Sequence, residues 1–188
     1  MRLGILGGSF NPIHHGHLLI AERAAEQARL DRVLLIPAAQ PPLKEARDVA
    51  PAAERLALVR AAVRGHPLFE ASDLEIRRGG VSYTIDTLRA LERRRPSATP
   101  FLILGADAAE LLPRWKSIDE VAARATFLFA ARPGYEIRAR MPKQQIVEVP
   151  LLDISSTEIR ERLRRGRSVR WLVPEPVRRR LERKRLYR

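Results

Sequence analysis

The residues best suited to chemistry lie in one short stretch, Gly7 to Leu18, which reads GGSFNPIHHGHL. Its paired glycines let the backbone turn sharply and approach a ligand, and Gly16 gives similar room where a helix begins. His14 and His17 are three residues apart, a spacing that places both imidazoles on one side of a helical turn. The first N–H groups of a helix carry the positive end of its dipole. The stretch therefore predicts an anion site formed by two imidazoles and a helix N-terminus.

Flanking patterns indicate which elements hold this stretch. The apolar run from Leu3 to Leu6 predicts a buried strand, and apolar residues after Leu18 recur with imperfect helical spacing. The stretch thus joins a strand to a helix, which is where α/β folds bind phosphate. It has neither the Gly-Lys-Ser/Thr of a Walker A loop nor the G-x-G-x-x-G of dinucleotide sites. It predicts a different kind of phosphate site.

A second candidate for phosphate binding lies near the other end of the chain. Ser155-x-x-Glu158 matches a capping box, which needs no function. Alternatively, the hydroxyls of Ser156 and Thr157 and the helix N–H groups meet a phosphate that Arg160 clamps. Taken alone, these residues leave both interpretations open.

Together the two motifs resemble the pair found in the nucleotidylyltransferase superfamily, H-x-G-H at His14 to His17 and S-S-T-x-x-R at Ser155 to Arg160. The whole chain is similar to the bacterial nicotinate-nucleotide adenylyltransferase family within it. The resemblance implies transfer of AMP from ATP to nicotinate mononucleotide, giving nicotinate adenine dinucleotide and pyrophosphate in NAD biosynthesis. The attacking phosphate has a second pKa of about 6 and is largely ionised at neutral pH, so no general base is required.

The resemblance also implies roles for individual residues. His17 is expected on the α-phosphate, with His14 supporting the phosphate chain and Arg160 clamping it, so that these three are the expected catalytic residues. The cofactor expected with ATP is Mg²⁺. Further contacts with ATP are expected from Gly7, Gly8, Ser9, Phe10, Gly16, Gly105, Asp107, Ile154 and Ser156.

The segment from Val81 to Leu88 contains S-Y-T-x-D-T, similar to the family segment that lines the nicotinate pocket. Tyr83 and Thr84 are therefore expected to bind the substrate. The residues themselves offer a structural alternative, because Thr84 is a plausible N-cap and Asp86 a first-turn acid.

Gly105-Ala106-Asp107 and the later L-x-x-W also resemble the family. Trp115 is expected to stack its flat ring on the pyridine ring, the alternative being an ordinary core residue, and Lys116 is expected to bind the substrate as well. Asp107 either meets a ribose or a hydrated magnesium ion, or caps the short helix that follows it. Ser117-x-x-Glu120 predicts a capping box and nothing more.

A proline-marked loop, residues 38–44, follows the second expected strand. Similar enzymes have Pro-Pro-His-Lys here, whereas this chain has Leu43 in the His position. Lys44 is expected to bind substrate phosphate, the alternative being a solvated loop lysine.

Strand and helix patterns alternate along the chain as a parallel sheet demands. The expected fold is α/β, a Rossmann-like doubly wound, mostly parallel sheet with helices on both faces and a small C-terminal helical segment. Residues 1–188 are expected to form a single domain, with the C-terminal helical part at about 155–188. Strands are expected at 3–6, 32–37, between 68 and 76, and at 100–104, 126–131 and 144–149; helices are expected after Leu18 and at 52–63, 84–94 and 174–188.

Composition limits the other functions. The absence of cysteine excludes thiolate catalysis and Cys-ligated zinc, and a total of four histidines disfavours a His-only zinc site, so no protein-held metal is expected. The net charge of +13 fits anionic ligands. A nucleic-acid-binding protein is one alternative, disfavoured by an aromatic content of 5% and the lack of an interleaved basic and aromatic surface. A sister adenylyltransferase, acting on nicotinamide mononucleotide or phosphopantetheine, would share both phosphate motifs.

No apolar run approaches the length of a membrane span, and no signal-peptide pattern opens the chain, so a cytoplasmic protein is expected. The expected partners are ATP and nicotinate mononucleotide. The sequence leaves open whether the chain forms a homo-oligomer.

Overall fold

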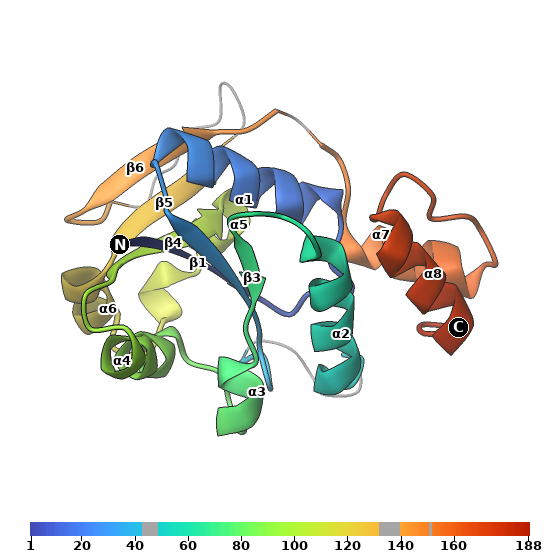
Figure 1. Cartoon of the computed structure of the whole chain (residues 1–188), viewed down its shortest axis with the longest axis horizontal. Helices are drawn as coiled ribbons and strands as arrows, with labels where there is room; N and C mark the ends of the chain where they lie inside the picture. Colours follow the sequence, from blue (N-terminus) through green and yellow to red (C-terminus); the bar gives the residue numbers. More distant parts are fainter. Residues whose placement is uncertain (43–48, 132–139, 151) are drawn as a thin grey trace.

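The computed structural model describes residues 1–42, 49–131, 140–150 and 152–188, which build a six-stranded sheet (Figure 1). All its pairings are parallel, in the order β3-β2-β1-β4-β5-β6. This is the strand order of a doubly wound sheet, and it confirms the expected fold class. The strands are β1 (Arg2–Gly8), β2 (Arg32–Pro37), β3 (Phe69–Ala71), β4 (Thr99–Gly105), β5 (Thr126–Ala131) and β6 (Gln144–Glu148).

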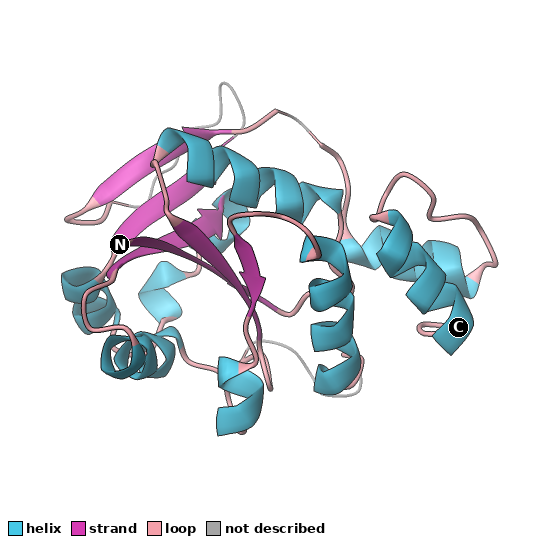
Figure 2. Ribbon diagram, viewed as in Figure 1, coloured by secondary structure: helices cyan, strands magenta, loops and turns pink. Residues whose placement is uncertain are grey.

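Helices cover both faces of the sheet, as Figure 2 shows. They are α1 (His15–Gln27), α2 (Ala52–Val63), α3 (Leu74–Arg78), α4 (Thr84–Arg94), α5 (Ala106–Ala109), the 3₁₀ turn η2 (Leu112–Arg114), α6 (Ile118–Arg124), α7 (Ser156–Arg164) and α8 (Glu175–Lys184). Among the described residues, no helix has both the length and the apolar character needed to cross a lipid bilayer.

Alternation along β2 shows how the strands serve both layers. Val33 and Leu35 pack with the buried residues of α1, α2, α7 and α8, whereas Leu34 and Ile36 pack with those of α3, α4 and α6. Successive side chains of a strand point to opposite faces, so a strand buried on both sides is apolar throughout. The continuous apolar run of β2 has this cause.

Gly4, inside β1, has a packing role that the sequence analysis did not assign. A Cβ atom built on it would lie 2.7 Å from Leu30 Cδ1 and 3.1 Å from Val33 Cγ2. The first contact is too close for a real methyl group, and the second is tight. Gly4 therefore lets Leu30, in the loop after α1, pack directly on the central strand.

The segment expected to be a third strand between Leu68 and Ile76 is only partly one. β3 stops at Ala71, and α3 occupies the rest, with Asp73 as its N-cap residue. Asp73 pairs with Arg77 at 3.0 Å, which supports this short helix. Leu74 and Ile76 flank the acidic Glu75, and this short pattern fits a strand and a helix equally well. The sequence pattern alone therefore could not distinguish the two structures.

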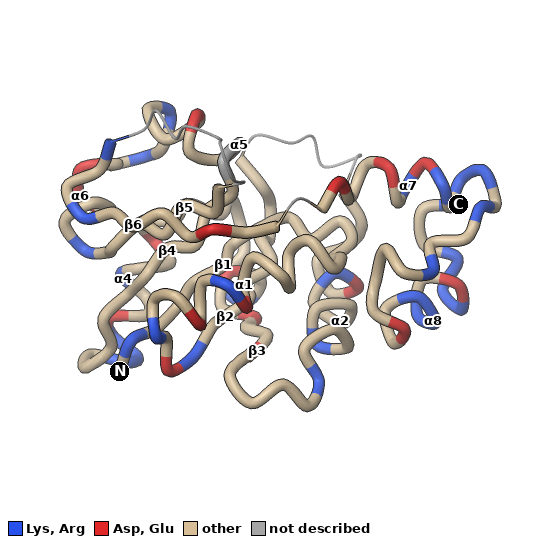
Figure 3. The backbone as a smooth tube through the Cα atoms, turned by 90° about the horizontal axis from the view of Figure 1, so that it is seen from above, with Lys and Arg blue, Asp and Glu red and all other residues tan. Residues whose placement is uncertain are grey.

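The C-terminal helices lie beside α2, at one end of the molecule (Figure 1). Val177 and Leu181 of α8 are fully buried, which confirms that they dock. Arg180 Nη2 lies 2.9 Å from Glu54 Oε2 and Lys184 Nζ lies 3.5 Å from Glu54 Oε1, so ion pairs add to the contact with α2. Lys and Arg crowd this end, as Figure 3 shows.

Candidate active site

The turn between β1 and α1 is held by its apolar residues as well as its glycines. Phe10 adopts a left-handed backbone conformation, with φ 42°, although it is not glycine. Its ring is 1% exposed and lies in the core, and burial offsets the cost of this conformation. Among the described residues other than its two chain neighbours, no heavy atom lies within 4 Å of a Cβ built on Gly7, so the backbone before the turn faces open space. A ligand can approach it there.

The two histidines of the H-x-G-H motif lie against each other. Their ring centroids are 3.7 Å apart, and the edge of Phe10 supports His17 at 5.1 Å. His17 Nδ1 accepts the backbone N–H of His14 at 3.3 Å. A neutral imidazole that accepts at Nδ1 carries its proton on Nε2. His17 is therefore prepared to donate a hydrogen bond from Nε2.

His14 is neutral at physiological pH. Burial, and to a lesser degree the nearby His15, lowers the pKa of His14 to about 4. Its Nδ1 is buried without a hydrogen-bond partner among the described residues. A Cβ on Gly16 would lie 3.0 Å from that atom. Gly16 thus makes room for the His14 imidazole as well as for a ligand.

The second motif packs directly onto this turn. Ser155 Oγ accepts the N–H of Glu158 at 3.1 Å, so Ser155 caps α7 as expected. Ser156 Oγ donates to the Pro12 carbonyl at 2.8 Å, and Arg160 Nη1 donates to the Asn11 carbonyl at 2.9 Å. Two motifs more than 140 residues apart thus form one structure. The Ser156 proton is used in holding the turn rather than being aimed at a ligand.

A pocket of about 240 Å³ opens at the carboxyl ends of β1 and β4. It brings together seven of the residues predicted to bind ATP or the substrate: Gly7, Gly8, Ser9, Tyr83, Thr84, Trp115 and Lys116. Its floor is apolar, with Ile5, Leu102 and Leu104. A small apolar pocket with a few polar groups at its rim suits a single aromatic ring that carries one substituent.

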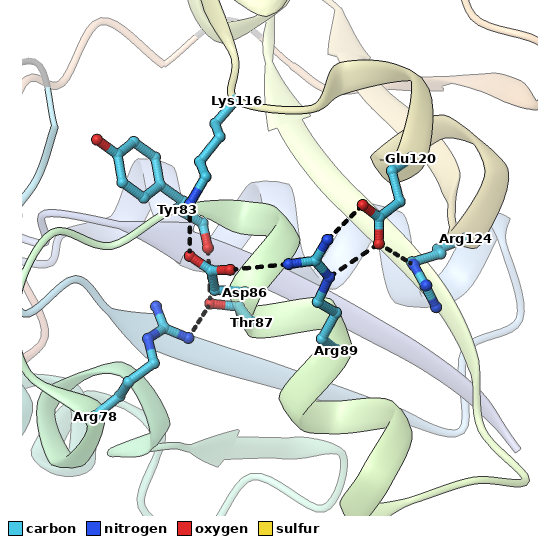
Figure 4. Close-up of polar contacts among 8 residues, drawn as sticks. All are labelled: Arg78, Tyr83, Asp86, Thr87, Arg89, Lys116, Glu120 and Arg124. Atoms are coloured by element: carbon cyan, nitrogen blue, oxygen red, sulfur yellow. Dashed lines mark hydrogen bonds and ion pairs between the residues drawn. The ribbon is translucent and has the colours of Figure 1, made fainter.

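The start of α4 differs in detail from the expectation. Tyr83, not Thr84, is the N-cap residue, and its side chain makes no capping hydrogen bond. Asp86 lies in the first turn as expected. Its carboxylate is 3.5 Å from Lys116 Nζ, which also lies 4.6 Å from the centroid of the Tyr83 ring (Figure 4). Asp86 and Tyr83 therefore hold Lys116 at the pocket rim.

The capping box expected at Ser117 and Glu120 is absent. Ser117 has a left-handed backbone, with φ 53°, and makes no side-chain cap. Glu120 instead accepts from Arg89 Nη2 at 2.6 Å and from Arg124 Nε at 3.0 Å (Figure 4). Charge-assisted hydrogen bonds to two guanidinium groups are stronger than a hydrogen bond to one backbone N–H. The Glu120 carboxylate therefore binds the two arginines instead of capping α6.

Glu75 is a buried carboxyl group at the pocket that the sequence analysis did not single out. Burial raises the pKa of Glu75, while hydrogen bonds from Thr87 and Ser82 and the charge of Arg78 act in the opposite sense. Thr87 Oγ1 donates to Glu75 Oε1 at 2.6 Å. Ser82 Oγ also accepts the N–H of Ala39 at 2.9 Å, which ties the loop after β2 to this group.

Arg55 is the other site residue that sequence reasoning missed. Its side chain is 1% exposed, and its guanidinium donates only to carbonyl groups among the described residues. The acceptors are Ala50 and Ser9, each at 2.8 Å, Ala38 at 2.7 Å and Ala39 at 3.1 Å. Arg55 therefore joins the loop after β1 to the loop after β2. Its signal was its position, three and four residues before the buried Leu58 and Val59 of α2.

The remaining predicted residues are placed less fully. Lys44 and Leu43 lie outside the described residues, and for Asp107 only the backbone, within α5, is described. Gly105 ends β4, and within the part of the chain that the structure describes no heavy atom other than those of its chain neighbours lies within 4 Å of a Cβ built on it. Ile154 lines a second cavity of about 510 Å³ on the other side of the H-x-G-H turn, with His15 and Trp171. Among the described residues, no three His, Asp or Glu side chains gather as a metal site.

Comparisons with known proteins agree with this geometry. Residues 5–162 match the model of the cytidylyltransferase-like family. The chain is 47% identical over 190 residues to the "Probable nicotinate-nucleotide adenylyltransferase" of Exiguobacterium sibiricum, covering 100% of this chain and 99% of that protein. It is 43% identical over 195 residues to the protein of the same name from Synechococcus sp. (strain JA-2-3B'a(2-13)), with coverages of 99% and 96%.

A solved structure shares the fold. It is Plasmodium falciparum nicotinic acid mononucleotide adenylyltransferase complexed with NaAD, with a TM-score of 0.84, 18% identity and coverage of 99% of this chain and 97% of that one. The sequence matches include both motifs and the residues that line the pocket. The chain belongs to the nicotinate-nucleotide adenylyltransferase family, a branch of the cytidylyltransferase-like proteins.

Proposed function

We propose that this protein transfers AMP from ATP to nicotinate mononucleotide, giving nicotinate adenine dinucleotide and pyrophosphate, a step of NAD biosynthesis. The observation that carries the proposal is that Gly7, Gly8 and Ser9, which lead into the H-x-G-H motif, line a ring-sized pocket. Tyr83, Trp115 and Lys116 line the same pocket. A phosphate bound at the turn and a ring bound in the pocket would be the two ends of one mononucleotide.

The reaction needs positioning and charge stabilisation more than proton transfer. The phosphate of nicotinate mononucleotide attacks the α-phosphorus of ATP, the bond to the β-phosphate oxygen breaks, and pyrophosphate leaves with its electron pair. Both reactants are polyanions, so they must be held in line against their repulsion. The protein groups available for this are the Nε2–H of His17, the guanidinium of Arg160 and the N-terminus of α1.

His14 has a different part in this scheme from His17. It is buried and neutral before ligands bind, so it supplies a hydrogen-bonding ring rather than a charge. A neighbouring polyanion favours the protonated form of an imidazole. His14 can therefore gain a proton as ATP binds and support the phosphate chain as a cation.

Mg²⁺ is proposed to arrive with ATP, because this ion prefers phosphate oxygens and water to a cage of protein ligands. When bound, it neutralises charge on the phosphates that leave. Asp107 and Lys44 are proposed as further contacts, the first through a hydrated ion or ribose and the second through substrate phosphate.

The rim of the pocket favours the acid form of the substrate over the amide. Arg114 and Lys116 both line it, whereas Glu75, the acid that also lines it, accepts hydrogen bonds from Thr87 and Ser82. A carboxylate on the ring would form a further ion pair with Lys116, which already pairs with Asp86 at 3.5 Å. A carboxamide would gain a hydrogen bond without this charge, so it should bind more weakly.

The proposal is tested by measuring pyrophosphate release from ATP and Mg²⁺ with nicotinate mononucleotide, nicotinamide mononucleotide or phosphopantetheine as separate acceptors. Release that is strongest with nicotinate mononucleotide is expected. Preference for the amide would contradict the assigned substrate, and release with none of them would contradict the reaction.

A further inference from the structure

The segment after α8 bends back toward the phosphate-binding turn. Arg185 and Tyr187 both have left-handed backbones, with φ 48° and 66°, and the N–H of Leu186 bonds to the Leu181 carbonyl at 3.1 Å. Such conformations are unfavourable for residues other than glycine, so the contacts that they permit must offset their cost. Here Leu186 and Tyr187 pack against the core shared by the sheet and the C-terminal helices.

The bend delivers one polar group to the turn. Tyr187 Oη donates to Asn11 Oδ1 at 2.7 Å, across 176 residues of sequence. Asn11 is 1% exposed, and its Oδ1 also accepts the N–H of Ala50 at 3.0 Å. Its main-chain carbonyl accepts from Arg160. Asn11 is therefore the residue through which three distant segments hold the turn that leads into His14.

The surroundings of the phenol keep it a donor. Burial raises the pKa of the Tyr187 hydroxyl, although the nearby charges of Arg55 and Arg160 act in the opposite sense. Asn11 Oδ1 has no proton to give, so the direction of this bond is fixed. The contact stays in place across the neutral pH range.

We propose that Tyr187 is a positioning residue for the adenylyl transfer, which it serves by fixing Asn11 and thus the turn from Ser9 to Ile13 in its phosphate-binding shape. This inference rests on the function proposed above. Tyr187 does not line either cavity beside the turn, so it acts through Asn11 rather than on a substrate. The residues after α8 then support the site, whereas α8 itself packs against α2.

The test compares Tyr187→Phe, which keeps the ring and removes only the donor, with Arg188→Ala, an exposed neighbour, as the matched control. The expected result is that kcat falls about tenfold in Tyr187→Phe, in proportion to one lost hydrogen bond. The KM for nicotinate mononucleotide should change little, because most residues that line the ring pocket lie outside the turn from Ser9 to Ile13. Arg188→Ala should leave both constants unchanged.

A double-mutant cycle separates positioning from a general loss of packing. If the hydroxyl acts through Asn11, adding Tyr187→Phe to Asn11→Ala should lower kcat no further. Reductions that multiply in the double variant would show that the two residues act independently and would overturn the proposal. Wild-type kcat in a folded Tyr187→Phe protein would overturn it as well.

A binding measurement keeps this inference distinct from the proposed function. ATP binding with Mg²⁺, followed by calorimetry, requires only the phosphate-binding turn. If the wild-type protein releases no pyrophosphate with any acceptor, the function fails, and ATP affinity then decides the positioning role. An affinity roughly fivefold weaker in Tyr187→Phe would support it, and an equal affinity would reject it.

Discussion

At the scale of single residues, His17 has a defined proton because of its neighbour's backbone. The N–H of His14 occupies Nδ1 of His17, which leaves Nε2–H as the donor. His17→Ala should lower kcat by about a hundredfold or more, the usual loss when one donor to a transition-state oxyanion is removed. The fold should survive, because His17 is only half-buried. Steady-state kinetics and a melting curve measure the two effects.

His17→Asn is the matched comparison, because an amide can still donate a hydrogen bond. It should recover part of the activity lost in His17→Ala. Equal, near-normal turnover in both folded variants would contradict the role assigned to His17.

His14 gives the stability of the protein a predictable dependence on pH. Its pKa is about 4 when folded and about 6.5 when unfolded, so below pH 6.5 the unfolded chain binds a proton that the folded chain does not. Stability should therefore fall as the pH drops from 6.5 to 4, by roughly 3 kcal/mol from this group. Above pH 6.5 the penalty is absent. Denaturant unfolding of the wild-type protein and of His14→Gln at pH 4.5 and 7.5 measures it.

The His14→Gln variant should lose this part of the pH dependence while other groups keep theirs. An identical slope in both proteins would show that the His14 imidazole titrates normally in the folded state.

Replacing Arg55 should affect both the stability of the protein and its catalysis. Arg55→Met removes the donors of four buried carbonyl bonds, so we expect a loss of roughly 3 kcal/mol in the free energy of unfolding. The KM for ATP should rise, because Ser9 and Ala38 are no longer joined. Arg60→Met, on the exposed side of the same helix, is the control and should change little. A stable Arg55→Met protein with normal kinetics would refute this account.

At the scale of elements, the start of α4 and the chain before α6 together form the rim of the pocket. Asp86 comes from the first turn of α4, and Lys116 follows η2 (Figure 4). Lys116→Met should lower the preference for nicotinate over nicotinamide mononucleotide, measured as the ratio of their kcat/KM values, by about tenfold. Lys143→Met, an exposed lysine on another segment, is the control. An unchanged ratio in Lys116→Met would move selectivity to another group.

Elements with a strong periodic pattern were predictable from sequence, and those decided by tertiary contacts were not. Strands that are buried on both faces read as continuous apolar runs. The positions of β1, β2, β4 and β5 could therefore be predicted from such runs in the sequence. The two Ser-x-x-Glu patterns are alike in sequence, yet only Ser155 caps its helix. Glu120 does not take part in a capping box because its carboxylate binds Arg89, a residue 31 positions away that no local pattern includes.

The candidate site divides in the same way. The H-x-G-H stretch was predictable because its residue types are chemically unusual together, whereas the residues of the ring pocket were predicted from their resemblance to family segments. Arg55, Glu75 and Tyr187 were not predicted, since each acts through bonds to distant backbone or side-chain groups. The role of each of these residues depends on which loops the fold brings together.

At the scale of the whole molecule, the order of the strands explains where the pocket opens. β1 lies between β2 and β4, and the chain leaves β1 toward one half of the sheet and later returns to the other half. Loops that follow β1 and β4 therefore diverge at their carboxyl ends, where the pocket opens. The C-terminal segment closes the far side of the turn through Tyr187 and α7.

The pairing of β1 with β4 also governs how the chain reaches this state. Leu3 pairs with Arg32 on one side and with Pro100 on the other, so the second pairing must close a loop of nearly a hundred residues. Parallel sheets with such long-range pairings fold slowly, because the entropy of loop closure is lost before the contacts form. The β1–β2 half, which contains the H-x-G-H turn, can form first. The two walls of the pocket should therefore assemble at different times, with the wall from β4 arriving second.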